Sequence, residues 1–184
     1  MLGYLILIAG VGLWAGAHLF KRLAPERRAS MGEGGKGLVA VLLLVSILLM
    51  WLGYRWADPV RLWYPPPFLT HLNNLLVLIG FYFFAADGMK TGITRVVRHP
   101  QLTGFKAWAL AHLLVVPTLA GVILFGGLLA WAVVSVIVLN RTTARPAPPP
   151  PAGMGKEIGA VIGALVATAV VGWIHGWLGP WPFG

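Results

Sequence analysis

The sequence predicts an all-α, polytopic membrane protein, a bundle of six transmembrane helices whose two termini lie outside the cytoplasm. Composition, the length of the uncharged runs and the placement of basic residues carry this prediction. Hydrophobic residues make up 58% of the 184 positions and charged residues only 10%, whereas soluble domains carry about 25% charged residues. The lipid bilayer is therefore the expected main partner of the chain.

Long uncharged runs place the six spans. A transmembrane helix needs about 20 mainly apolar residues, and the candidate spans are residues 2–20, 37–54, 69–86, 102–117, 118–139 and 157–179. These use most of residues 1–184, so we expect a single transmembrane domain. As one helix, the fourth and fifth runs would reach ~55 Å, too long for a hydrocarbon core about 30 Å thick. Pro117 is expected to separate them, because proline lacks a backbone donor and clashes with the preceding turn.

Basic residues alternate between successive loops, which predicts the orientation. Cytoplasmic loops accumulate Lys and Arg, and the first, third and fifth loops carry most of them here: Lys21, Arg22, Arg27, Arg28, Lys36, Lys90, Arg95, Arg98, Arg141, Arg145 and Lys156. The second loop has two, and the fourth loop and both termini have none. We interpret the formal charge of +9 as a topology signal and expect no nucleic-acid binding, since the charges are scattered over short loops.

Other segments suggest how the helices pack and end. Residues 145–155 contain four consecutive prolines, Pro148 to Pro151, and should form an extended linker before the last span. Two G-x-x-x-G pairs, Gly12/Gly16 and Gly159/Gly163, suggest close helix contacts. Aromatic residues gather at the predicted outer ends, as interfacial anchors do: Trp51, Trp56, Trp63, Tyr64, Trp177 and Trp181. No internal repeat is evident, and the absence of cysteine excludes disulfides and thiolate metal sites.

Five histidines are the main chemical signal: His18, His71, His99, His112 and His175. Ionisable groups inside a membrane are costly and mark candidate functional sites. Acids are nearly absent from the predicted spans, since Asp87 and Glu157 lie at helix ends. This disfavours proton-coupled transport through buried carboxylates.

His112 and His18 are the candidate ligands of a b-type haem. His112 is expected well inside the hydrocarbon region, on one helical stripe with Trp108, and His18 follows Trp14 by four residues. A porphyrin could lie on such aromatic surface, and imidazole is a common axial ligand of haem iron. A hydrogen-bonded core histidine and a zinc site built from three imidazoles are the alternatives.

The remaining polar candidates fall near the two membrane surfaces. His71 and Asn74 share a face at the outer end of the third span, and His175 lies at a similar depth on the sixth. They could line an outer pocket, although contact with headgroups explains them equally well. Arg98 and His99 precede the fourth span on the cytoplasmic side, where they could bind an anionic headgroup or a cofactor phosphate; a plain interfacial loop is the alternative.

The segment R-H-P-Q-L-T-G-F at residues 98–105, continuing as W-A-L-A-H-L-L at 108–114, resembles the NnrU family of bacterial membrane proteins. Residues 16–19, 71–76 and 124–131 extend the resemblance. It implies a multi-pass protein of the bacterial inner membrane, so that the outward termini expected from the basic residues would be periplasmic, and a role in denitrification or nitric oxide metabolism. It also implies kinship with plant zeta-carotene isomerase, a haem b enzyme. His112 and His18 would correspond to the axial ligands of that enzyme.

The function implied by this resemblance divides into three possibilities. An accessory protein that binds haem or nitric oxide is favoured, because Ala109 replaces the cysteine through which the isomerase switches iron ligation. A haem-dependent cis–trans isomerase of a polyene, with a lipophilic substrate, is the second. The third follows from the R-H-P-x-x-x-G segment, which also resembles membrane methyltransferases that use S-adenosylmethionine. Whether the protein is an enzyme stays open.

Overall fold

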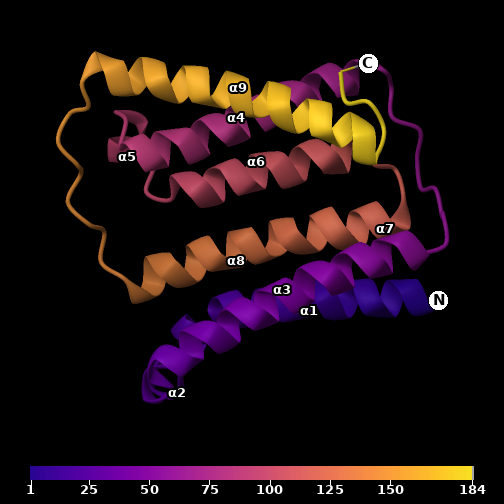
Figure 1. Ribbon diagram of the computed structural model, residues 1–184, viewed down its shortest axis with the longest axis horizontal. Coiled ribbons are helices and arrows are strands. Elements are labelled where there is room, and N and C mark those ends of the chain that lie inside the picture. The colour runs from indigo at the N-terminus through magenta and orange to yellow at the C-terminus, as the bar shows by residue number, and fades with distance from the viewer. Residues whose placement is uncertain (184) are drawn as a thin grey trace. The chain divides into compact units, whose positions relative to one another are not determined.

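The computed structural model describes residues 1–183, and their regular secondary structure is helical (Figure 1). One isolated β-bridge joins Arg61 to Thr118. The helices are α1 (Leu2–Leu23), α2 (Pro25–Ser30), α3 (Gly32–Trp56), α4 (Phe68–Met89), α5 (Ile93–Val96), α6 (Pro100–Val115), α7 (Leu119–Gly121), the π-helix η1 (Val122–Gly126), α8 (Gly127–Thr142) and α9 (Met154–Leu178). The predicted all-α class is confirmed.

Five helices are long and apolar enough to cross a membrane: α1, α3, α4, the continuous helix Leu119–Thr142 and α9. The fourth expected span corresponds to α6, which has only 16 residues. At 1.5 Å per residue it measures about 24 Å, less than a typical hydrocarbon core of about 30 Å. The six-span count and the outward placement of both termini therefore stay predictions.

The predicted break at Pro117 is present, and its backbone groups have partners. Helix α6 ends at Val115, and Thr118 caps the next helix by accepting a hydrogen bond from the Gly121 amide (3.0 Å). The carbonyl of Pro117 accepts from the Leu62 amide at 2.7 Å, and the Leu119 amide donates to Val60 at 2.9 Å. An interruption of a helix in an apolar environment is tolerated only when the freed backbone N–H and C=O groups find hydrogen-bond partners.

The chain forms two compact units, each built from two separate segments. Unit 1 comprises Met1–Tyr64 and Val116–Thr142, and unit 2 comprises Pro65–Val115 and Thr143–Gly184. Unit 1 thus contains α1, α3 and the continuous helix from α7 to α8. Unit 2 contains α4, α6 and α9.

In unit 1, α1 and α3 pack side by side through glycines (Figure 1). A Cβ atom added at Gly10 would lie 2.8 Å from the Met50 amide nitrogen, and Cβ atoms at Gly3 and Gly53 would overlap backbone atoms of the facing helix. The prediction that Gly12 and Gly16 make a close helix contact is wrong, because an added Cβ at either position meets nothing within 4 Å. G-x-x-x-G spacing alone did not identify the packed face.

The continuous helix of unit 1 also packs on α1, where a Cβ added at Gly127 would lie 2.7 Å from Val11 Cγ1. Its second turn is the π-helix Val122–Gly126, which the sequence analysis did not anticipate. In a π-turn each backbone hydrogen bond spans one residue more than in an α-helix. The extra residue rotates all later side chains about the helix axis. This rotation helps to set the direction of Trp131 on α8.

In unit 2, α4 is the central helix and contacts both α6 and α9. A Cβ added at Gly104 would lie 2.6 Å from the carbonyl oxygen of Gly80, so the backbones of α6 and α4 touch. On α9, an added Cβ at Gly159 would lie 3.3 Å from Met89 Sδ, and one at Gly163 would lie 4.0 Å from Ala85. The predicted Gly159/Gly163 pair therefore does face a neighbouring helix.

Residues 179–183 return along the end of α9 and fasten it to α4 (Figure 1, yellow). The side-chain amide of Asn74 donates through Nδ2 to the carbonyl of Pro182 at 2.9 Å. The ring of Trp181 lies against Gly176, and the ring of Phe183 lies against Gly172. The glycines leave room for the two aromatic side chains on the surface of α9.

We expect Gly104→Val to destabilise unit 2 by about 1–3 kcal/mol, the usual cost of overpacking a tight contact. Gly88→Val is the matched control, since an added Cβ there meets nothing within 4 Å. Thermal unfolding in one detergent, followed by the loss of helical circular dichroism, measures both variants. Equal midpoints for the two would contradict the backbone contact between α4 and α6.

The return of the C-terminal segment can be tested with cysteine pairs, because the chain has no native cysteine. Asn74→Cys combined with Pro182→Cys should form a disulfide on mild oxidation, detected as a linked peptide pair by mass spectrometry. Leu75→Cys with Pro182→Cys is the control, because Leu75 is exposed and points to another side of α4. Crosslinking of the control pair alone would show that the segment is placed elsewhere.

Candidate functional site

His18 lies five residues before the end of α1, in unit 1. Its ring nitrogen Nδ1 is 3.0 Å from the carbonyl oxygen of Trp14, one helical turn earlier. A carbonyl oxygen can only accept, so Nδ1 carries the proton in this hydrogen bond. In the neutral imidazole the other nitrogen, Nε2, then holds the lone pair that could ligate a metal.

Two indole rings flank the His18 imidazole. The Trp14 ring centroid lies 4.2 Å from it, at an interplanar angle of 44°, and the Trp131 centroid lies 4.6 Å from it, at 57°. The two indoles meet edge to face at 5.4 Å. Trp131 comes from α8 and is buried. Trp131 was not among the residues predicted from the sequence, although it ends one of the segments that carry the family resemblance.

His112 has the same local arrangement in unit 2. It lies in the last turn of α6, and its Nδ1 is 2.9 Å from the carbonyl oxygen of Trp108. The two ring centroids are 5.0 Å apart, and Phe105 follows at 5.2 Å from Trp108. The predicted aromatic stripe is therefore present. His112 lies three residues before the end of α6 at Val115, and its expected depth in the hydrocarbon region stays a prediction.

The two histidines belong to a short repeat that the sequence analysis missed. Residues 14–19 read W-A-G-A-H-L and residues 108–113 read W-A-L-A-H-L. The four-residue spacing brings each imidazole over the carbonyl of its own tryptophan. The alanine before each histidine, Ala17 and Ala111, is buried, so a neighbouring helix can approach closely. Unit 1 and unit 2 each hold one copy.

Asn73 of α4 supports the second copy. With its amide oriented to satisfy both groups, its nitrogen donates to the Ala111 carbonyl at 3.1 Å, and its oxygen accepts from the Asn74 backbone amide at 3.3 Å. Asn73 is buried. This contact connects α4 to the residue before His112.

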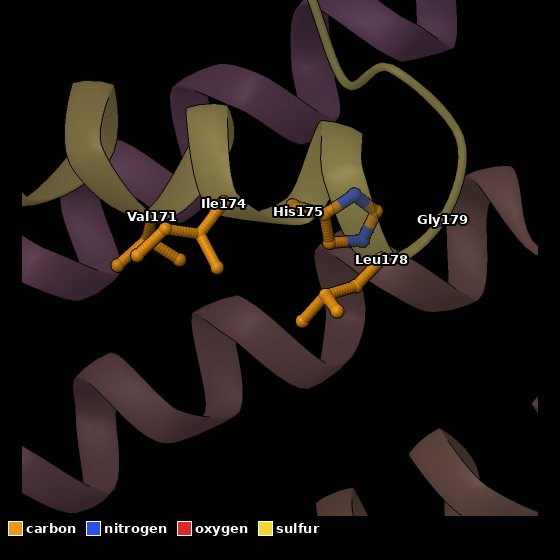
Figure 2. Close-up of a pocket in the computed structure, with 5 residues that line it drawn as sticks. All are labelled: Val171, Ile174, His175, Leu178 and Gly179. Carbon is orange, nitrogen blue, oxygen red and sulfur yellow. The ribbon is translucent and has the colours of Figure 1, made fainter.

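His175 lies in the last turn of α9 and lines an open hollow on that helix, as Figure 2 shows. Its Nδ1 is 2.8 Å from the carbonyl of Pro180, so Nε2 again holds the lone pair. The hollow is lined by Val171, Ile174, His175, Leu178 and Gly179. Neither His71 nor Asn74 lines this hollow, so the predicted outer pocket with these two residues stays a prediction. His71 is exposed on α4, and Asn74 binds the C-terminal segment.

Arg98 and His99 stand before α6, as the sequence predicted. The carbonyl of His99 accepts hydrogen bonds from the Thr103 amide at 2.9 Å and from its hydroxyl at 3.0 Å. Arg98 Nη2 donates to the carbonyl of Thr143, at the start of the linker before α9. Both residues therefore help to order the entry into α6.

The structure brings His112, Trp108 and His175 into unit 2 and places His18 in unit 1. Whether the imidazoles of His18 and His112 face one shared centre stays a prediction, since each unit is described separately. No three His, Cys, Asp or Glu side chains gather into a metal-binding group within residues 1–183. A zinc site of three imidazoles therefore finds no support in the part of the chain that the structure describes.

Comparison with known proteins gives one match, which covers both units. The family model described as "NnrU protein" matches residues 6–182 of the 184. No curated protein and no solved structure matches the chain. With all but its first five and last two residues inside the match, the chain belongs to the NnrU family.

Proposed function

We propose that this NnrU protein binds haem b in the bacterial inner membrane and serves nitric oxide metabolism in denitrifying cells as an accessory protein. His18 and His112 are the residues that would hold the haem, through their imidazole rings. The observation that carries the proposal is shared by both histidines. In each, Nδ1 donates to the backbone carbonyl one turn earlier, at 3.0 and 2.9 Å.

This hydrogen bond matches what metal-binding histidines require. A ligating imidazole almost always donates its other ring N–H to a carbonyl or carboxylate, which fixes the ring and makes the ligating nitrogen more basic. A helix carbonyl performs this role for both His18 and His112. The aromatic rings beside them, Trp14, Trp131 and Trp108, supply the flat apolar surface that a porphyrin needs.

The chain's own residues would bind the group, orient it and exclude water. When bound, haem would supply an iron that exchanges one electron, or that coordinates a small molecule such as nitric oxide in place of one of the two histidines. The two indoles around His18 restrict rotation of its ring and keep its surroundings apolar. The absence of cysteine leaves a non-covalent b-type haem as the form that fits.

The two enzymatic alternatives receive less support. Ala109 is fully buried at the position where the isomerase relative has its ligand-switching cysteine, and a methyl group offers no ligand atom. This argues against polyene isomerisation. A methyltransferase would use Arg98 to bind its cosubstrate, but that side chain donates to the Thr143 carbonyl and would have to exchange this partner.

The absorption spectrum of the purified protein tests haem ligation. We expect a Soret band, and we expect His18→Ala and His112→Ala each to lower the haem-to-protein ratio by about tenfold or more, since loss of a supporting group alone costs 10–100-fold. His71→Ala is the matched control, because His71 is exposed. An unchanged Soret band in both ligand variants would remove the proposed assignment.

Trp131 provides a second test, because it touches the imidazole without being a ligand. We expect Trp131→Leu to weaken haem retention by about 10-fold, in the range for supporting residues, and to shift the Soret band. Trp131→Phe should restore most of the retention by replacing one aromatic wall with another. Trp173→Leu, at an exposed tryptophan of α9, is the control. Equal spectra for the Leu variants at 131 and 173 would contradict a positioning role.

A further inference from the structure

Two arginines of unit 2 are held together by crossed hydrogen bonds at one end of the helices. Arg98, before α6, donates through Nη2 to the carbonyl of Thr143. Arg145, two residues after Thr143, donates through Nη2 to the carbonyls of Arg95 (3.2 Å) and Val96 (2.9 Å). Each guanidinium reaches the segment that carries the other, so two positive charges are brought close to one another.

The carboxylates of unit 2 bind elsewhere. Unit 2 contains two acids, Asp87 and Glu157, against six lysines and arginines. Asp87 pairs with Lys90 at 3.2 Å, and Glu157 accepts a hydrogen bond from the Gly92 amide at 2.7 Å. The two guanidiniums have backbone carbonyls as their partners instead, and a carbonyl carries no net charge.

Arg98 also has a buried donor that lacks an acceptor. Its Nε is shielded from solvent and hydrogen-bonds to no atom of the described residues. Burying part of a cation without a counter-charge is costly, and two like charges in proximity add repulsion. A nearby anion would reduce both costs.

We propose that Arg98 and Arg145 form a binding site for the phosphate group of an anionic phospholipid. Guanidinium groups present paired donors that match the geometry of phosphate oxygens. Both arginines lie just outside helix ends, Arg98 two residues before α6 and Arg145 three residues after α8, which is where headgroups meet a membrane protein. Basic residues beside membrane helices attract anionic lipids. This site is independent of the proposed haem function.

Lipid binding would also hold the linker before α9 in place. The crossed hydrogen bonds fasten the first residues of this linker to α5 and to the entry of α6. A phosphate that bridges the two guanidiniums would reduce their repulsion and strengthen both fastenings. Protection of the non-proline amides among residues 143–153 is therefore a local reporter of an occupied site.

The full-length protein in nanodiscs tests the proposal by hydrogen exchange of the non-proline amides of the linker, at residues 143–145, 147, 152 and 153. Phosphatidylglycerol mixed into phosphatidylcholine should slow exchange in this linker. Arg98→Gln with Arg145→Gln should abolish the slowing and weaken binding of phosphatidylglycerol, measured by native mass spectrometry, by about tenfold or more. Arg27→Gln with Arg141→Gln is the matched control, since both residues are exposed charges of unit 1.

Three results would overturn the proposal. These are equal protection in phosphatidylcholine alone, equal protection of the glutamine pair and wild type, and an equal loss in the control pair.

If inorganic phosphate protects the linker in phosphatidylcholine nanodiscs, the ligand is a free anion and the lipid source is wrong. Arg98→Lys with Arg145→Lys keeps the charges but removes the paired donors, so it should fold and bind phosphatidylglycerol more weakly than wild type. Unchanged binding in that variant also counts against the site.

Discussion

An apolar surrounding that offers no hydrogen bonds is the constraint on which the rest of this structure depends. Inside a membrane, polar groups must find partners within the protein. The helix break at Pro117 meets this requirement through Thr118 and the strand-like segment around Leu62. The histidines meet it in the same way, because Nδ1 of His18 and of His112 donates to a helix carbonyl. The hydrogen bond that satisfies Nδ1 thereby also leaves the ligating lone pair of the neutral imidazole on Nε2.

The same surrounding explains why the helices pack through glycine and alanine. Lipid tails are as apolar as leucine, so helices gain little from burying large side chains and associate by close backbone contact. The sequence predicted this principle and one correct pair, Gly159/Gly163, but selected Gly12/Gly16 wrongly. Gly3 and Gly10 on α1 make the contact with α3 instead. Spacing shows which residues share a face, whereas only tertiary structure shows which face meets a neighbour.

Prediction of the candidate site succeeded where the geometry is local. The pairs Trp14/His18 and Trp108/His112 follow from four-residue spacing in a helix, and the structure confirms both ring contacts. Trp131 was missed because it reaches His18 from another helix, after a π-turn that alters the direction of its side chain. Hydropathy extended the fourth span to residue 117, two residues past the end of α6 at Val115, because apolar composition does not show where a helix ends. The contact between Asn74 and Pro182 depends on the chain folding back, which no periodicity indicates.

The repeat W-A-x-A-H-L separates what the two histidine sites share from what distinguishes them. The hexapeptide sets the tautomer and ring orientation in both units, because each imidazole bonds within its own helix. What surrounds each copy comes from other helices: the Trp131 indole lies against His18, and the Asn73 amide bonds to the residue before His112. Polarity around an axial ligand tunes the reduction potential of haem iron. In the proposed haem protein, ligand identity is thus encoded locally and duplicated, while the properties of each ligand depend on tertiary contacts that differ between the two units.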